Sequence, residues 1–152
     1  MSSLAQKTTP CTVRVRSRTK DSGGFDCAAL EKPMRIYHNP ACGTSRTVLG
    51  LIRAAGVEPE IVEYLKTPPD RAELTGLLAR LGLTPREILR RKGTTLETLG
   101  LDEAAMTDAA ILDAILAHPI LMERPIVVTA QAAAVCRPAD RVAPLLASET
   151  AP

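Results

Sequence analysis

Residues 36–46 read IYHNPACGTSR, and this stretch decides how the rest of the chain is interpreted. Two apolar residues belong to a predicted strand, Asn39-Pro40 forms a turn, and a helical pattern begins just after a single cysteine, Cys42. The start of a helix carries unpaired backbone N–H groups and about half a positive charge. A thiolate there is stabilised, so the pKa of the thiol falls below its free value of about 8.5. The stretch therefore predicts that Cys42 is a nucleophile rather than a small buried apolar residue.

The residues that follow Cys42 predict an anion site at the same place. Backbone N–H groups in a first helical turn bind tetrahedral oxyanions, and Gly43 and Thr44 supply such groups here. Ser45 stands where a CxxC motif would have its second cysteine. Because serine cannot resolve a mixed disulfide, the resolving thiol is expected to come from glutathione, from a partner protein or from Cys136.

Two polar residues before the cysteine, and one after it, are predicted to support the loop. His38 ends the predicted strand, where it either tunes or deprotonates Cys42 or simply hydrogen-bonds to backbone; the sequence leaves both open. Asn39 and Ser45 are expected to shape and cap the loop. The Ser45 hydroxyl could also donate a hydrogen bond to the thiolate.

The sequence on both sides of the loop predicts a β-α-β unit. Residues 34–38 and 60–64 read as strands, and residues 45–55 carry apolar side chains at helical spacing. The helix positions expected to face the core are Val48, Leu51, Ile52 and Ala55. Gly56 is expected to end this helix. The connection is long enough for two parallel strands.

Three further helices are predicted next in the chain. Residues 67–82 open with Thr-Pro-Pro and end at a glycine. Residues 84–93 begin with TPRE, the pattern of a capping box, which places Arg90 in the last turn of that helix. Residues 107–118 begin with Thr-Asp, and the helix is expected to close at the following His-Pro pair.

The C-terminal part predicts two strands at residues 125–129 and 133–137, followed by a short helix at 139–146. The whole order is β-α-β, then helices, then β-β-α. This is the α/β order of the thioredoxin-like fold, with a helical insertion between its two halves. The domain is expected to cover residues 34–147, with a C-terminal tail at 148–152.

Residues 1–33 predict a disordered basic arm, because they lack sustained hydrophobic periodicity. They hold six Lys and Arg against three Asp and Glu, a net charge of +3, whereas residues 34–152 sum to −1. A targeting segment and a nucleic-acid-binding tail are the alternatives. Since aromatic residues make up only 2% of the chain, no nucleic-acid partner is predicted. No apolar run approaches the roughly 18 residues that a membrane span needs, so no membrane association is expected either.

The four cysteines, Cys11, Cys27, Cys42 and Cys136, form no CxxC pair and no cluster with histidine. Such spacing predicts neither a zinc site nor a disulfide framework. Free thiols in a reducing cytoplasm are therefore expected, with no metal bound.

Five segments together carry a resemblance to a known family. They are IYHNPACGTSR (36–46), EYLKTPPDRAEL (63–74), LRRK (89–92), HPILMERPIVVT (118–129) and VCRP (135–138). In this order they resemble the glutaredoxin-dependent arsenate reductases of the thioredoxin-like superfamily, from about Met34 to Leu146. The first and fourth segments are the specific ones.

The resemblance implies a role for each matched residue. Cys42 would attack arsenate, while Arg90, Arg124 and Arg137 would bind its oxygens. Pro125 would be the cis-proline beside the active cysteine. Glutathione would be the co-substrate and glutaredoxin the partner that restores the thiol, with no bound cofactor.

Simpler roles stay open for several of these residues. Arg90 could serve only the helix dipole, Arg124 could be an edge-strand charge, and Cys136 is expected to lie in the core. Phosphatase-type arsenate reductases place five residues between cysteine and arginine in one loop, whereas only three separate Cys42 from Arg46. The loop therefore cannot wrap an anion in the same way, and this second type of arsenate reductase is not predicted. Two other functions compete with arsenate reduction: a glutathione-linked thiol oxidoreductase and a non-enzymatic adapter of the same fold.

Overall fold

A computed structural model of the chain describes residues 34–91, 96 and 98–150. The predicted arm at 1–33 lies outside these residues. No helix within the described ranges is long and apolar enough to cross a membrane.

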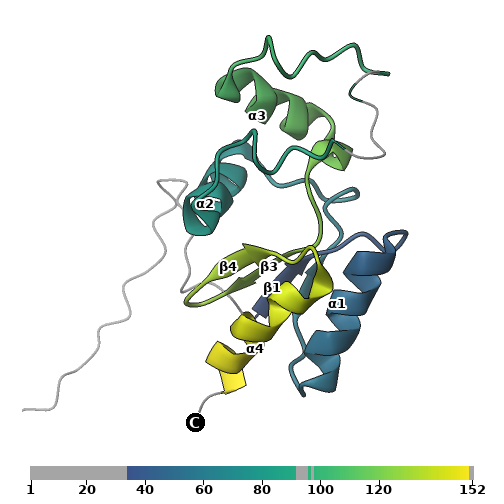
Figure 1. Ribbon diagram of the computed structural model, residues 1–152, viewed down its shortest axis with the longest axis vertical. Coiled ribbons are helices and arrows are strands. Elements are labelled where there is room, and N and C mark those ends of the chain that lie inside the picture. Colours follow the sequence, from purple (N-terminus) through teal and green to yellow (C-terminus); the bar gives the residue numbers. More distant parts are fainter. Residues whose placement is uncertain (1–33, 92–95, 97, 151–152) are drawn as a thin grey trace, which may run out of the picture.

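A four-stranded mixed sheet forms the centre of the domain (Figure 1). Its strands are β1 (Met34–Tyr37), β2 (Glu60–Val62), β3 (Ile126–Thr129) and β4 (Ala133–Val135), in the order β2-β1-β3-β4. β1 pairs with β2 in parallel, while β1 with β3 and β3 with β4 are antiparallel. The predicted β-α-β and β-β arrangements are therefore confirmed, although the strands are shorter than expected.

Helix α1 (Gly43–Ala54) connects β1 to β2 and begins directly after Cys42. It starts two residues earlier than predicted, and Gly56 follows it in the left-handed region at φ 81°. The expected apolar face was wrong in part, because Leu51 is 40% exposed and Ala55 is also exposed. The buried residues of α1 are Ser45, Val48 and Ile52. Their spacing shows that only a narrow stripe of the helix packs on the sheet.

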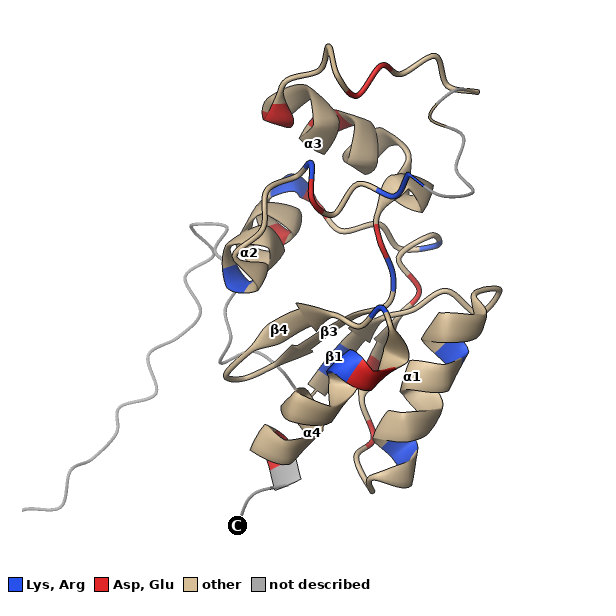
Figure 2. Ribbon diagram, in the orientation of Figure 1, with Lys and Arg blue, Asp and Glu red and all other residues tan. Residues whose placement is uncertain are grey.

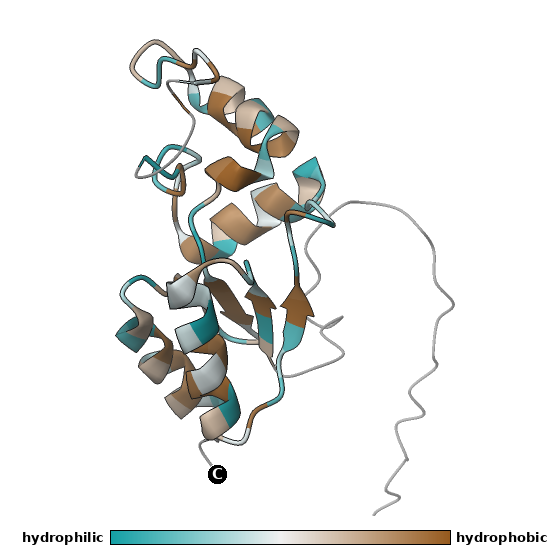
Figure 3. Cartoon of the chain, turned by 90° about the vertical axis from the view of Figure 1, so that its right-hand side faces the viewer, coloured by the Kyte–Doolittle hydropathy of each residue, from teal (hydrophilic) through white to brown (hydrophobic). Residues whose placement is uncertain are grey.

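Alternate residues of the central strands face two separate hydrophobic cores, as the two-residue period of a strand requires. Ile36 and Val127 lie in one core, with residues of α1 and of the C-terminal α4 (Ala143–Thr150). Tyr37 and Val128 lie in the other core, with the helices of the insertion. Figures 1 and 3 show α1 and α4 together beside the sheet and the helices of the insertion grouped above its upper end.

The insertion contains α2 (Arg71–Leu81) and α3 (Asp108–Ala117). Helix α2 begins after Asp70, whose carboxylate accepts the backbone N–H of Glu73 at 2.7 Å, so the predicted start at residue 67 was too early. Its end at Gly82 is confirmed by the left-handed conformation of that residue, φ 64°. Helix α3 has the predicted Thr107 cap and ends at His118.

The predicted helix at 84–93 does not form over its described residues. The capping-box hydrogen bonds are made, since Glu87 Oε2 accepts the backbone N–H of Thr84 at 2.7 Å, but only a turn follows them. From Ile88 the chain is extended instead. Ile88 and Leu89 are both buried in the insertion core, and this burial outweighs the local helix signal.

The extended segment pairs with residues 121–123, which places Arg90 next to the segment that leads to Arg124. Leu89 and Met122 form an isolated antiparallel bridge. The backbone N–H of Arg90 donates to the carbonyl oxygen of Leu121 at 2.7 Å. Arg90 is therefore not in a last helical turn, and the helix-dipole interpretation of this residue was wrong.

Two short 3-10 helices complete the described fold. They are η2 (Pro119–Leu121), which leads from α3 toward β3, and η3 (Ala139–Val142), which leads from β4 into α4. The predicted C-terminal helix at 139–146 is thus η3 and α4 together, and α4 continues past 146 to Thr150.

Candidate active site

The loop before α1 holds Cys42 at the N-cap position of the helix, as the sequence predicted. The Asn39 side-chain oxygen accepts the N–H of Ala41 at 2.9 Å, and the Asn39 carbonyl accepts the N–H of Cys42 at 3.0 Å. Asn39 therefore folds the loop into a tight turn. Cys42 itself is partly exposed, so a small molecule can reach its sulfur.

The pKa of the Cys42 thiol is lowered from 9.0 to about 7. Partial burial is the largest single influence and raises the pKa. It is outweighed by the backbone N–H and hydroxyl of Ser45 and by the guanidinium of Arg124, which all favour the thiolate. The sulfur is therefore about half ionised at neutral pH.

The guanidinium of Arg124 interacts with the Cys42 sulfur, and it is held from several sides. Only 8% of the residue is exposed. Its Nη1 donates to the Tyr64 hydroxyl at 3.2 Å and to the Ile120 carbonyl at 3.3 Å. Its Nε is buried and has no acceptor among the residues that the structure describes. A buried guanidinium donor beside a reactive sulfur is suited to an oxygen atom of a bound anion.

Tyr64 is a site residue that sequence reasoning missed. It is fully buried in the insertion core, and its hydroxyl holds Arg124. Burial raises the pKa of this phenol, so it stays neutral and can accept the hydrogen bond. No local pattern marks it as a site residue, because in the sequence it is only the last residue of the strand predicted at 60–64.

The Arg124–Pro125 peptide bond is cis, as the resemblance implied for Pro125. This bond begins the segment that enters β3, which lies next to β1 in the sheet. Arg124 and the loop after β1 are thereby brought to the same end of neighbouring antiparallel strands.

Ser45 and His38 lie next to the sulfur loop but differ in their contacts. Ser45 is fully buried, and its hydroxyl has no oxygen or nitrogen partner within the described part of the chain. Burial lowers the pKa of His38, which keeps the imidazole neutral, and the ring interacts with the backbone of Ser45. A direct role of His38 in ionising Cys42 remains a prediction.

Gly43 and Thr44 form the start of α1, so their N–H groups belong to the unpaired set at the helix terminus. A Cβ atom added at Gly43 would meet nothing within 4 Å. The space beside this residue is therefore open to a ligand. Oxyanion binding by these two residues remains a prediction.

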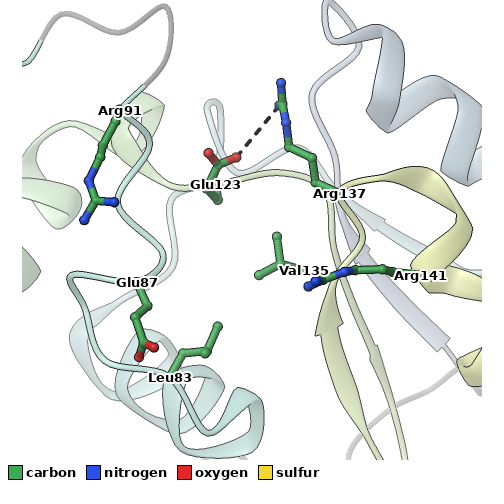
Figure 4. A pocket seen from close by; sticks show the side chains of 7 residues that line it. All are labelled: Leu83, Glu87, Arg91, Glu123, Val135, Arg137 and Arg141. Carbon is green, nitrogen blue, oxygen red and sulfur yellow. Dashed lines mark ion pairs between the residues drawn. The ribbon is translucent and has the colours of Figure 1, made fainter.

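The other two predicted oxyanion ligands, Arg90 and Arg137, converge on a carboxylate that the sequence analysis did not anticipate. Arg90 Nη1 lies 3.7 Å from Glu123 Oε2, and Arg137 Nη1 lies 3.8 Å from the same oxygen. Glu123 and Arg137 both line a pocket of about 420 Å³, and Figure 4 shows their charged ends pointing toward each other. Charged residues of both signs lie along the connecting segments in this part of the molecule (Figure 2).

Cys136 does not join the site as a second thiol. It is fully buried, and burial raises the pKa of its thiol to about 12. Its expected place in the core is confirmed. The described residues also contain no group of histidine, cysteine and acidic side chains that could hold a metal ion.

Known proteins resemble this chain over most of the described domain. The sequence pattern of the ArsC family matches residues 37–145. An arsenate reductase from Rhizobium meliloti is 53% identical over 111 residues, which cover 73% of this chain and 79% of the relative. An arsenate reductase from Escherichia coli K12 is 50% identical over the same shares of the two chains.

A solved structure gives the same result for the fold. The arsenate reductase from Vibrio cholerae superposes with a TM-score of 0.69 at 38% identity, covering 74% of this chain and 97% of that one. The thioredoxin-like fold predicted from the sequence is thereby confirmed. The chain belongs to the ArsC family.

Proposed function

We propose that this protein reduces arsenate to arsenite, with Cys42 as the nucleophile and glutathione and glutaredoxin as the electron donors. One observation carries the proposal: the Cys42 thiol, with a pKa of about 7, lies beside Arg124, whose buried Nε has no acceptor in the described structure. The thiolate supplies the attacking electron pair, and the guanidinium supplies a donor for an oxygen of the substrate. The relatives named as arsenate reductases, at about 50% identity, support the same substrate.

In the first step the Cys42 thiolate attacks the arsenic of arsenate. A sulfur–arsenic bond forms, one arsenic–oxygen bond breaks, and the departing oxygen takes up a proton and leaves as water. Arsenic stays pentavalent in this step. Arg124 and the N–H groups at the start of α1 bind the remaining oxygens and stabilise their charge.

In the second step the thiolate of glutathione attacks the Cys42 sulfur. A disulfide bond forms and the sulfur–arsenic bond breaks. Its electron pair stays on arsenic, which is reduced from As(V) to As(III) and leaves as arsenite. A dithiol of glutaredoxin then attacks the glutathione sulfur and releases the Cys42 thiolate.

Two features of the chain support external thiols as the electron donors. Ser45 occupies the position of a resolving cysteine, and Cys136 is buried with a raised thiol pKa. An external thiol is therefore needed to complete the cycle, and no bound cofactor takes part. We also propose that the protein works in the cytoplasm, where reduced glutathione keeps thiols free.

The proposal is tested by coupling turnover to NADPH oxidation with glutathione, glutaredoxin and glutathione reductase. We expect a rate that depends on arsenate, is lost in Cys42→Ser and falls strongly in Arg124→Ala. Arg53→Ala removes an exposed charge near the far end of α1, where it pairs with Glu58, and should change little. If the wild-type protein shows no arsenate-dependent rate but still reduces glutathionylated peptides, the thiol oxidoreductase alternative replaces arsenate reduction.

A further inference from the structure

The Glu123 carboxylate lies between two of the three arginines assigned to the oxyanion. Its Oε2 atom is 3.7 Å from Arg90 and 3.8 Å from Arg137 (Figure 4 shows the second pair). The Glu123 side chain is 21% exposed and that of Arg90 only 12%, whereas that of Arg137 is 38% exposed, so the Glu123–Arg90 pair is the part of the cluster that is shielded from water. A carboxylate here offsets the positive charge of two groups that the proposed reaction needs for its substrate.

The backbone fixes Glu123 in this place. Its N–H donates to the carbonyl of Ile88 at 2.7 Å, within the same antiparallel pairing that positions Arg90. The Glu123 Oε2 atom also lies 3.4 Å from the backbone nitrogen of Arg124, which donates to it. The carboxylate is therefore adjacent to all three arginines: to Arg90 and Arg137 through their side chains, and to Arg124 through its backbone.

The two side-chain contacts are too long to be hydrogen bonds. Glu123 therefore lowers the positive potential of the site without forming the forked contacts that a carboxylate makes with arginine at short distance. A tetrahedral oxyanion of higher charge can make those contacts instead. Before any substrate arrives, the site holds three positive guanidinium groups, those of Arg90, Arg124 and Arg137. Their charge is opposed by two negative groups, the thiolate of Cys42 and the carboxylate of Glu123.

We propose that Glu123 is a built-in competing anion, which weakens the binding of tetrahedral oxyanions to the arginine cluster. The proposal rests on the proposed function, because it concerns the same oxyanion site. An incoming oxyanion either displaces the carboxylate from Arg90 and Arg137 or binds against its charge. Glu123 acts through these arginines and does not touch the reacting sulfur, so it affects binding more than the chemical step.

The test measures how well inorganic phosphate protects Cys42 from alkylation by iodoacetamide. The extent of reaction is read on the Cys42 peptide by mass spectrometry, as the ratio of rates with and without phosphate, which cancels any change in thiol ionisation. For Glu123→Gln we expect phosphate to protect at roughly a third to a tenth of the wild-type concentration, as loss of one nearby partly screened charge implies. Glu123→Asp keeps the charge and should stay closer to the wild type.

Steady-state kinetics with arsenate provide the second readout. In Glu123→Gln the KM for arsenate should fall by about the same factor as the phosphate concentration that protects Cys42 from alkylation, while kcat changes little. Glu87→Gln is the matched control, because Glu87 lines the same pocket as Glu123 but its carboxylate accepts a hydrogen bond from Thr84. It should leave both readouts unchanged.

The possible outcomes separate the two proposals. Equal or weaker phosphate protection in Glu123→Gln, with protection present in the wild type, overturns the role of Glu123 only. If phosphate protects neither protein, the oxyanion site itself is wrong, and the proposed function fails together with this inference. A similar gain in Glu87→Gln would show a general charge effect and would also overturn the inference.

Discussion

Replacing Ser45 by alanine should raise the pKa of Cys42 without unfolding the protein. The Ser45 hydroxyl is one of the groups that lower the pKa of this thiol, together with the Ser45 backbone N–H and Arg124. Alanine keeps the backbone N–H and favours a helix, so only the hydroxyl contribution is lost. The substitution therefore isolates one hydrogen bond to the thiolate.

The size of the effect follows from the strength of that hydrogen bond. A hydrogen bond to a charged group contributes roughly 1.5–3 kcal/mol, and the lower value suits a partly exposed sulfur. Since about 1.36 kcal/mol corresponds to one pH unit, the pKa of Cys42 should rise from about 7 to about 8. At pH 7 the ionised fraction would fall from about one half to about one tenth.

The assay is the rate of Cys42 alkylation as a function of pH, read on the Cys42 peptide. The midpoint of the curve should be used rather than the rate at one pH. The thiolate of a thiol with a higher pKa is also more nucleophilic, and the logarithm of its rate constant rises with that pKa with a slope of about 0.4–0.5. Thr47→Ala is the control, since the Thr47 hydroxyl bonds to the carbonyl of Gly43 instead of the sulfur. An unchanged midpoint in Ser45→Ala would refute the reasoning.

Protein stability gives an independent check on Ser45→Ala. The hydroxyl is buried, interacts with the Cys42 sulfur and has no oxygen or nitrogen partner in the described residues, so its removal breaks no other hydrogen bond of the fold there. The melting temperature should therefore change little. A large fall would indicate that Ser45 supports the fold and that the change in pKa is indirect.

Three other substitutions or measurements test separate parts of the structure. Tyr64→Phe removes an acceptor of Arg124, so the KM for arsenate should rise about three- to tenfold with kcat less affected; an unchanged KM would mean that Tyr64 does not position the arginine. The pH profile of kcat/KM should climb with pH and level off above about 7, because the lowered pKa of Cys42 makes the thiolate dominant there; a profile still climbing at pH 9 would contradict this. Leu77→Ala empties a fully buried position, so the free energy of unfolding in urea should fall by about 2–5 kcal/mol, and a loss below about 1 kcal/mol would show that the insertion core is loosely packed.

The sequence predicted the elements whose signals are local. The cysteine loop at the start of α1, the Thr107 cap of α3 and the stop at Gly82 all depend on backbone groups within a few residues, and all three are present. The helix expected at 84–93 was wrong for a different reason. Its capping box forms, but Ile88 and Leu89 are buried by contacts with residues far along the chain, which no local pattern reports.

The same distinction holds for the site. Cys42 was identified from its own neighbours, and Arg90, Arg124 and Arg137 were identified only through the family resemblance. The structure places Arg124 at the sulfur and brings Arg90 and Arg137 to Glu123. Such partners depend on antiparallel pairing between distant segments, so their positions could not be read from composition or spacing.

The thiol of Cys42 is partly exposed and partly ionised, whereas that of Cys136 is buried, and this difference has a consequence for oxidative stress. Peroxide converts a thiolate such as that of Cys42 to a sulfenic acid, and a nearby thiolate can normally trap this product as a disulfide. Cys136 is fully buried with a thiol pKa of about 12, so it cannot do so. Rescue before irreversible sulfinic acid forms then depends on thiols outside the described domain, and a cell that exhausts its glutathione would lose the enzyme as well as its reductant.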